Sequence, residues 1–371
     1  MKIEIKDIII ICLLIVLVYL NIDKIMRIYK NIQKELFTPK KLDVHSDMTH
    51  VKKEQKVIQN SIKENITKYV KDKKLKEILF YVLEDGKKVR PIIVTSIYKQ
   101  LTNSTEIPDY IMDAALAIEY IHTASLIIDD IMDDDNYRRG KEALHYKYNL
   151  TIAQLAAVLL FSLGMENIFT ALEKINKTDP TNTNKNIPLL IGQMCSVLLT
   201  ELTKGQYLDI EVPIDIPGIG DMVKNSLQVS RQMKKIQDII EDMIHKKTSS
   251  LFEYSFIIPW VFANHTKTDK ELTDGIAKMK SIARQFGLIF QVSDDFEDIE
   301  QDAMRDGKNV AMNYVINKNP YDAYKDYKKL VDDFNKAAGE ENILTNEIKE
   351  IEAYLTKKVE VYYKAHSELQ P

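Results

Sequence analysis

The chain has 371 residues, a formal net charge of −4, and 45% hydrophobic and 29% charged residues. These values fit a globular protein with a sizeable core and argue against wholesale disorder. The lack of a basic excess argues against a general nucleic-acid binder, because such proteins neutralise phosphates with many lysines and arginines. The two cysteines, Cys12 and Cys195, can form neither a disulfide framework nor a cysteine zinc site, so the chain fits a reducing compartment.

The first predicted element is an uncharged apolar run at residues 8–20. It has no polar face, and charged residues beginning at Asp23 follow it in place of a small-residue cleavage site. It is short for a bilayer, because a spanning helix normally needs roughly 17–25 apolar residues. We expect an uncleaved membrane anchor at 1–25, with a buried N-terminal helix as the alternative. The basic residues after the run predict that the rest of the protein faces the cytoplasm, at the endoplasmic reticulum or a related internal membrane.

From about residue 51 onward, apolar residues recur at spacings of three and four, which predicts one helix after another. The clearest predicted core helices lie at 111–130 and 151–172. No internal repeat has the period of a helical solenoid. We therefore expect a linker at 26–50 and one large all-α domain, a single helical bundle, at 51–371.

Two acidic clusters each end a strongly apolar stretch. Asp129 and Asp133 are four residues apart, so their carboxylates would project from the same face of a helix, and Asp294 and Asp298 repeat this spacing. Like charges at this spacing destabilise a helix, which suggests a bound cation. Mg²⁺ prefers oxygen ligands and often bridges one or two carboxylates to phosphates. One such cluster is usually a solvated surface, but two facing carboxylate pairs could hold a diphosphate between them through metal ions. Residues 134–135 lie off this face and should end the helix or be solvated.

A diphosphate site also needs cations, and basic residues lie near the first cluster and upstream of it. Arg138 and Arg139 follow the cluster, whereas Lys87 and Arg90 belong to the segment 86–91. Arginine offers bidentate phosphate contacts and lysine a point charge. Pairs of basic residues are usually surface features, so their meaning depends on the wider pattern.

That pattern resembles the trans-isoprenyl diphosphate synthases, the farnesyl and geranylgeranyl diphosphate synthase family. Residues 119–141 resemble the first aspartate-rich motif of the family, with its upstream histidine and downstream paired arginines. Residues 286–298 resemble the second motif, with a trailing lysine at 308. The remaining three elements of the family pattern match 86–91 (GKxxRP), 205–209 (GQxxD) and 247–248 (a lysine–threonine pair). The five elements keep the family's order over roughly residues 80–315, and the resemblance implies an isoprenoid synthase fold with a central active-site cavity.

The resemblance also implies roles for individual residues. The primary ligands of about three Mg²⁺ ions would be aspartates of both clusters, with the other aspartates in support: Asp129, Asp133 and Asp294, then Asp130, Asp295 and Asp298. Basic residues would hold the allylic diphosphate: Arg138, Lys247 and Lys308. A second group would hold isopentenyl diphosphate: Lys87, Arg90, His122 and Arg139. Thr248 and Gln291 match positions along the path of the developing carbocation.

The implied reaction is a prenyl transfer from dimethylallyl, geranyl or farnesyl diphosphate to isopentenyl diphosphate. Small residues at Ala124 and Ser125, where short-chain farnesyl synthases carry aromatic ones, imply at least a C20 product. Tyr120, roughly one helical turn deeper below the first cluster, could close the floor of the pocket again. We favour geranylgeranyl diphosphate, with longer polyprenyl diphosphates or farnesyl diphosphate as alternatives.

Two rival interpretations remain. A terpene cyclase shares metal-dependent ionisation but is not expected to carry both aspartate motifs together with 86–90. A non-catalytic partner subunit or membrane scaffold would keep the fold but should have lost ligands, and none is lost here. The resemblance also implies a homodimer. In one respect the chain departs from the family pattern: residues 367–371 lack the basic motif that ends some farnesyl synthases.

Overall fold

The computed structural model describes residues 42, 44–178, 180, 184–211, 237–299, 302 and 313–367. The chain divides into two compact units, Met1–Leu42 and Asp43–Pro371. The apolar run at 8–20, and with it the whole expected anchor at 1–25, lies outside the described residues. Lys308 lies outside them too. Everything below concerns the second unit.

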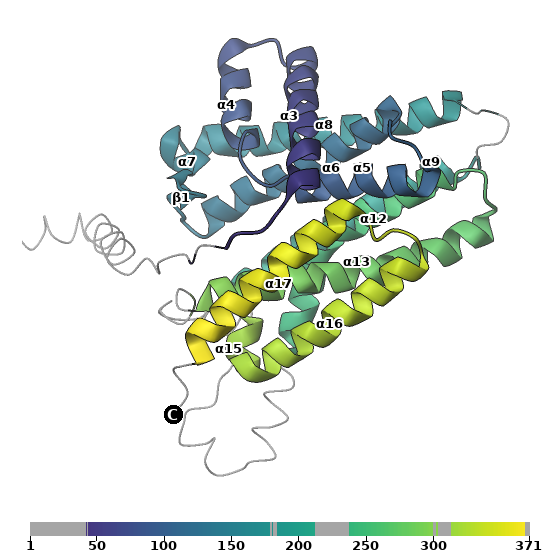
Figure 1. Ribbon diagram of the computed structural model, residues 1–371. Helices are drawn as coiled ribbons and strands as arrows, with labels where there is room; N and C mark the ends of the chain where they lie inside the picture. The colour runs from purple at the N-terminus through teal and green to yellow at the C-terminus, as the bar shows by residue number, and fades with distance from the viewer. Residues whose placement is uncertain are drawn as a thin grey trace, which may run out of the picture. The chain divides into compact units, whose positions relative to one another are not determined.

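The second unit is a bundle of helices (Figure 1), which confirms the predicted all-α class. Up to residue 211 the described helices are α3 (Thr49–Tyr69), α4 (Lys73–Leu83), α5 (Val89–Thr102), α6 (Asp109–Met132), α7 (Leu144–Lys147), α8 (Leu150–Thr178) and α9 (Ile187–Glu211). The second half contributes the π-helical turn η1 (His245–Ser249), α12 (Ser250–Ala263), α13 (Asp269–Glu297), α15 (Tyr314–Lys318), α16 (Pro320–Glu340) and α17 (Asn346–Ser367). Within the described ranges, the strands are a single two-residue hairpin, β1 (Tyr137–Arg138) and β2 (Lys141–Glu142).

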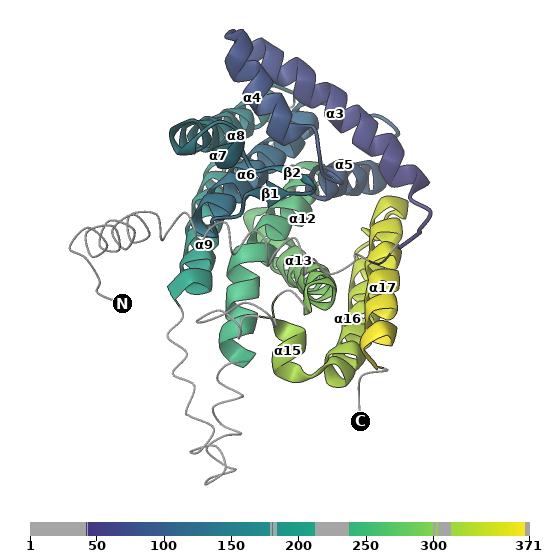
Figure 2. The same ribbon diagram turned by 90° about the vertical axis from the view of Figure 1, so that its left-hand side faces the viewer.

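Helix α12 forms the centre of the core. Every residue of it from Ser250 to Phe262 is buried, so protein covers this helix all round. Figure 2 shows α13 beside α12, with α16 and α17 beyond α13. The Phe286 ring of α13 packs 5.1 Å from Phe252 of α12 and 5.2 Å from Phe334 of α16. These aromatic contacts fix α13, and with it the second acidic cluster.

Helices α6 and α8 pack along each other and place the first acidic cluster. Gly164 allows the close approach, because a Cβ added there would lie 2.7 Å from a side-chain carbon of Ile121. By length and composition both helices could cross a membrane, but 67% of the most apolar window of α6 is buried within the bundle, and 50% of that of α8. Helix α6 is therefore a core helix, and α8 leaves an apolar face uncovered.

Helix α6 ends at the first acidic cluster. Asp133 is its C-cap residue, Asp134 has a φ of 52°, and the backbone N–H of Asp135 donates to the carbonyl of Asp130 at 3.0 Å. Aspartate is one of the few residues that adopt this left-handed conformation at low cost. The prediction that residues 134–135 end the helix is confirmed.

Candidate functional site

The two acidic clusters occupy the C-terminal ends of two long helices, α6 and α13. Asp129 lies in the last turn of α6 and Asp294 in the last turn of α13, whereas Asp133 and Asp298 are the C-caps. The end of a helix that carries unpaired carbonyl groups is itself partly negative, so these carboxylates add to a charge of the same sign. Such an arrangement requires cations from elsewhere in the protein or from solution.

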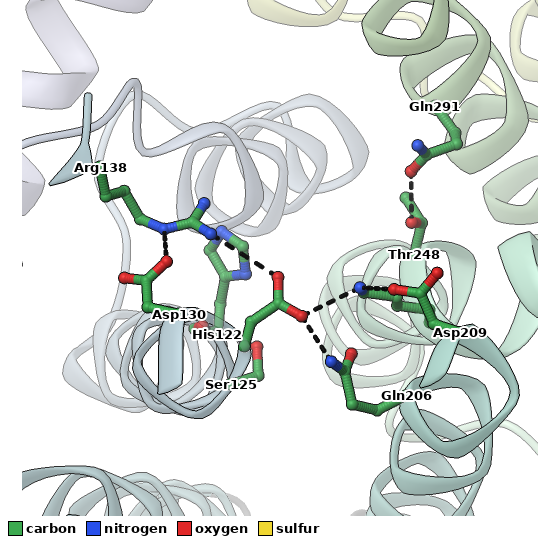
Figure 3. A network of polar contacts seen from close by, with 10 residues as sticks. His122, Ser125, Asp130, Arg138, Gln206, Asp209, Thr248 and Gln291 are labelled. Atoms are coloured by element: carbon green, nitrogen blue, oxygen red, sulfur yellow. Dashed lines mark hydrogen bonds and ion pairs between the residues drawn. The ribbon is translucent and has the colours of Figure 1, made fainter. Parts of the chain in front are cut away.

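The first cluster receives cations and donors from three other elements (Figure 3). Lys247 Nζ and Gln206 Nε2 donate to Asp129 Oδ1 at 3.0 and 2.5 Å. Arg138 of the hairpin forms an ion pair with Asp130 and lies 3.7 Å from Asp129 Oδ2. Arg138 follows the cluster closely in sequence, whereas Gln206 and Lys247 are distant in sequence and only the fold brings them to Asp129.

The π-helical turn η1 aims two consecutive residues in different directions. Lys247 reaches Asp129 and also Asp209 of α9, at 2.5 Å, while the Thr248 hydroxyl donates to Gln291 Oε1 of α13 at 2.7 Å. One extra residue in a helical turn is a common device at functional sites. Gly205 permits the approach of α9, because a Cβ there would lie 2.4 Å from the backbone nitrogen of Lys247.

The ionisation of the first cluster is shaped by burial and by its neighbours. Burial raises the pKa of Asp130 to about 6, against the opposing charge of Arg138. Asp133 is exposed as a residue, but the surrounding protein and the charge of Asp129 raise its pKa to about 6. Burial acts to lower the pKa of Lys247, yet Asp129 and Asp209 outweigh it and raise the pKa, so this lysine stays protonated.

The aspartates of the second cluster point in different directions. Asp294 is half-buried, and its Oδ1 accepts from Lys358 of α17 at 2.6 Å. Asp295 turns into the protein, where its two oxygens accept from Gln291 Nε2 at 2.8 Å and from the Tyr314 backbone N–H at 2.7 Å. Burial raises the pKa of Asp295 to about 8. Asp295 therefore ties α13 to α15, and its metal role stays a prediction.

A buried basic pocket lies next to the first cluster. The guanidinium of Arg90 packs 4.4 Å from the Phe252 ring, and its Nη1 lies 3.1 Å from Nε2 of His122. Arginine can only donate, so His122 Nε2 accepts and the imidazole is neutral. Burial, together with the charge of Arg90, holds the pKa of His122 well below its usual range. Arg90 Nε is buried without a hydrogen-bond partner among the described residues, so this N–H is available to donate to an anion.

The turn before α5 places the rest of this pocket. Lys88 adopts a left-handed φ of 54°, and its Nζ is buried against Glu119 at 3.0 Å and the carbonyls of Leu83 and Asp85. This internal anchor leaves the neighbouring Lys87 exposed. A cavity of about 60 Å³ lies between α4, α6 and the hairpin, and its polar lining includes His122, Asp130, Arg138 and Arg139.

Gly86 gives room to Arg139. Gly86 has a φ of 99°, and a Cβ there would lie 2.2 Å from Arg139 Nη1. We predict that Gly86→Ala displaces this guanidinium and raises the KM for the substrate that binds in this pocket about tenfold, the loss of roughly one charged hydrogen bond. Steady-state kinetics with each substrate varied in turn measures the effect.

The matched control for this prediction is Gly140→Ala. Gly140 also has a positive φ, 79°, but no atom lies within 4 Å of an added Cβ. Both variants carry backbone strain of about 1–3 kcal/mol, and only Gly86→Ala should move Arg139. Equal KM values in the two variants would contradict the role given to Gly86.

The residues predicted to limit product length occupy different sides of α6. The half-buried Ser125 precedes Asp129 by about one turn and lies on its face, with its hydroxyl donating to the carbonyl of His122 at 2.8 Å. Ala124 is fully buried. Tyr120 lies about two and a half turns before Asp129, on the opposite side, and its hydroxyl donates to Asn65 of α3 at 3.0 Å. Ser125 is thus the residue below the first cluster.

The donor set fits Mg²⁺ only if substrate oxygens complete it. Among the residues that the structure describes, no three carboxylate, histidine or cysteine side chains converge on one point. Each cluster instead offers carboxylates that now face a protein ammonium group, as Asp129 faces Lys247 and Asp294 faces Lys358. Mg²⁺ commonly uses one or two carboxylates together with phosphates and water. Asp129, Asp133 and Asp294 fit that pattern.

The structure also shows site residues that the sequence analysis left without a role. Gln206 and Asp209 contact Asp129 and Lys247, and the motif at 205–209 could have indicated them. Lys358 and Tyr354 of α17 contact Asp294 and Lys87. Both lie in a helix whose amphipathic pattern reads as simple packing, and no local signal distinguishes them.

Comparison with known proteins agrees with this geometry. A family model described as polyprenyl synthetase matches residues 72–341. A short chain isoprenyl diphosphate synthase of Methanocaldococcus jannaschii is 29% identical over 314 residues, which cover 82% of this chain and 84% of that protein. A farnesyl diphosphate synthase of Haemophilus influenzae is 31% identical over 250 residues, 67% of this chain and 74% of that protein.

Solved structures confirm the fold. The crystal structure of a geranyltranstransferase from Thermotoga maritima superposes with a TM-score of 0.59 at 23% identity, covering 86% of this chain and 98% of that chain. The expected isoprenoid synthase fold is therefore confirmed.

Proposed function

Because this chain belongs to the polyprenyl synthetase family, we propose that it is a trans-prenyltransferase. It condenses isopentenyl diphosphate with an allylic diphosphate, namely dimethylallyl, geranyl or farnesyl diphosphate. The observation that carries the proposal is the pairing of two acidic helix ends with a separate, buried basic pocket at Arg90 and His122. One region suits a metal-bound diphosphate and the other a second diphosphate.

The residues divide the work of the reaction between them. Asp129, Asp133 and Asp294 would hold Mg²⁺, which when bound supplies Lewis-acid stabilisation of the charge on a departing diphosphate. Lys247 and Arg138 lie beside Asp129 and offer N–H donors to the oxygens of the departing diphosphate. Charge growing on the departing oxygens is thereby stabilised as the allylic C–O bond breaks.

The basic pocket serves the acceptor. Arg90, whose buried Nε has no partner in the described part of the chain, and Lys87 and Arg139 nearby suit the diphosphate of isopentenyl diphosphate. The double bond of that substrate attacks the allylic cation and forms the new C–C bond. The released diphosphate then takes up the proton that the resulting cation loses, which leaves a product one C5 unit longer and inorganic diphosphate. Holding both substrates close converts a bimolecular step into an effectively unimolecular one.

Thr248 and Gln291 suit the stabilisation of the cation. The Thr248 hydroxyl donates its hydrogen bond to Gln291 Oε1, so the lone pairs of the Thr248 oxygen can face positive charge. Gln291 is held in turn by Asp295. No protein nucleophile enters this reaction. His122 binds substrate and does not act as a base.

Condensation assays test the proposal directly. The full chain in detergent is incubated with Mg²⁺, isopentenyl diphosphate and each of the three primers, and products are separated by chain length. Elongation is the expected result. Absence of elongation with every primer would favour a fold-retaining partner subunit or membrane scaffold, whereas a cyclised hydrocarbon would favour a terpene cyclase.

We favour geranylgeranyl diphosphate as the product, with longer polyprenyl diphosphates or farnesyl diphosphate as alternatives. Ala124 and Ser125 are both small, and Ser125, which lies on the Asp129 face of α6, is the residue whose size favours room for a growing chain below the first cluster. Tyr120 on the opposite side of α6 does not fill this room.

Ser125→Phe is expected to shorten the main product by at least one C5 unit, because a ring on the Asp129 face fills the space below the site. Product analysis by chromatography measures this. Tyr120→Phe is the control, since it removes only the hydroxyl that bonds to Asn65 and should leave product length unchanged. An unaltered product from Ser125→Phe would place the floor of the pocket elsewhere.

We also propose that residues 1–25 anchor the protein in an internal membrane such as the endoplasmic reticulum, with Asp43–Pro371 on the cytoplasmic side. The uncharged run at 8–20 and the basic residues after it support this. Alkaline extraction of membranes should leave the full-length chain in the pellet. Release into the supernatant would contradict a spanning segment.

A homodimer is the proposed assembly. On α8, Leu155, Val158 and Phe169 are exposed, at 60%, 61% and 58%, and their spacing puts them on one face of the helix. An apolar face of this kind is usually covered by protein. Sedimentation analysis should give twice the chain mass for the wild type, whereas Val158→Glu should sediment as a monomer.

A further inference from the structure

The C-terminal helix α17 contacts three separate parts of the bundle through one face. Glu350, Tyr354 and Lys358 are four residues apart, so their side chains follow the same side of the helix. The Glu350 carboxylate accepts from the backbone N–H groups of His50 and Val51 at 3.1 and 2.9 Å. It thereby satisfies donors in the first turn of α3, where Met48 provides no side-chain cap. This contact fixes the first half of α17.

Lys358 meets the second acidic cluster. Its side chain is 4% exposed, and its Nζ lies 2.6 Å from Asp294 Oδ1 and 2.8 Å from Glu297 Oε2. Burying an ammonium group is costly unless partners satisfy it, and here two carboxylates do so. Both carboxylates raise the pKa of Lys358, so it remains charged. Asp294 Oδ2 takes no part in this contact.

One turn earlier, Tyr354 meets the basic pocket. The Nζ of Lys87 lies 3.6 Å from the centre of the Tyr354 ring. Lys87 is otherwise an exposed, long side chain with many rotamers, and a cation–π contact restricts it. The same helix face thus touches a predicted metal ligand and a predicted diphosphate ligand.

We propose that α17 is a positioning element of the site, in which Lys358 fixes the Asp294 carboxylate for metal–diphosphate binding and Tyr354 fixes Lys87 for the second diphosphate. The proposal rests on the proposed function for the identity of the ligands. Figure 2 shows α17 running beside α13. Helix α17 thus positions Asp294 and Lys87 from within the bundle. The basic motif that ends some farnesyl synthases is not present at residues 367–371.

The alternative is that Lys358 merely stabilises the packing of α17 on α13. Removing one partner of a buried ion pair costs about 3–5 kcal/mol whatever its function, so loss of stability cannot distinguish the two roles. The distinguishing quantity is the affinity for a metal-bound diphosphate. A packing role would leave that affinity unchanged in the folded protein.

The test uses the full chain, saturating Mg²⁺ and inorganic diphosphate, with binding measured by titration calorimetry. Lys358→Met should weaken the affinity at least tenfold, Lys358→Gln by less because its amide can still donate, and Lys358→Arg should bind nearly as the wild type does. If Lys358→Met does not fold, Lys358→Gln carries the test. Folded variants with wild-type affinity, whatever their melting temperatures, would overturn the proposal.

Kinetics separate the two contacts of α17. Lys358→Gln should raise the KM for the allylic diphosphate and leave that for isopentenyl diphosphate unchanged. Tyr354→Leu should do the reverse by about fivefold, the size of one exposed cation–π contact, and Tyr354→Phe should restore the wild-type value because the ring remains. Equal effects of each variant on both KM values would contradict separate positioning.

Two outcomes distinguish a failure of the proposed function from a failure of the role of α17. A wild-type chain that binds Mg²⁺ and diphosphate but elongates no primer would refute the proposed function and leave the Lys358 series interpretable. A wild-type chain that elongates primers, together with a Lys358 series of uniform diphosphate affinity, would refute only the role of α17.

Discussion

Asp129→Asn is expected to lower turnover by on the order of a thousandfold while the fold is retained. The asparagine carbonyl can still accept from Gln206 and Lys247, which hold Oδ1 in the wild type, so the local hydrogen bonds survive. What is lost is the negative charge that a hard cation requires. Steady-state turnover at saturating substrates, with the melting temperature measured in parallel, separates lost chemistry from lost structure.

The matched control lies in the same cluster. Asp134 is exposed and has a φ of 52°, a conformation that asparagine also tolerates. Asp134→Asn should therefore keep wild-type turnover. Removing Mg²⁺ from the wild type with a chelator should reproduce the Asp129→Asn result, and adding Mg²⁺ back should rescue only the wild type. Normal turnover by Asp129→Asn would refute its role as a primary ligand.

Arg90→Lys is expected to raise the KM for isopentenyl diphosphate about a hundredfold, or about 2.7 kcal/mol. Lysine keeps the positive charge but loses the planar group that packs on Phe252, the donor to His122 and the buried Nε. An Arg-to-Lys change is not conservative where the guanidinium stacks on an aromatic ring and donates several hydrogen bonds. The KM for the allylic diphosphate should change little, because Arg90 lies in the other pocket.

Arg284→Lys controls for this prediction, since it makes the same change outside the site. Arg284 donates to Glu253 at 2.7 Å, and Lys280 already lies 3.4 Å from the same carboxylate, so the charge balance is kept. Both KM values of this variant should match the wild type. A similar rise in both KM values for Arg90→Lys would show that the two diphosphate pockets are not separate.

The sequence anticipated the fold class and the acidic clusters because both depend on local patterns. Apolar residues at spacings of three and four identified the helices, and the spacing of Asp129 and Asp133 placed two carboxylates at one helix end. The helix-ending role of Asp134 followed from the same local chemistry.

Other features could not be predicted, because they depend on contacts between distant segments. Asp295 belongs to the second acidic cluster, but its side chain turns toward Tyr314 because it is buried and accepts from the Tyr314 backbone N–H. Tyr120 lies in the motif yet bonds to Asn65 of another helix. Neither orientation is encoded in the residues next to it.

The all-α class, the two acidic helix ends and the basic residues of the family pattern can be recognised in the amino-acid sequence. Which cation meets which carboxylate cannot: Lys247 lies at Asp129 and Lys358 at Asp294 because of the way the helices pack. Helix periodicity is set within a few residues, whereas an ion pair across a bundle depends on how whole helices pack. The role of Lys358 therefore became visible only with α17 in place.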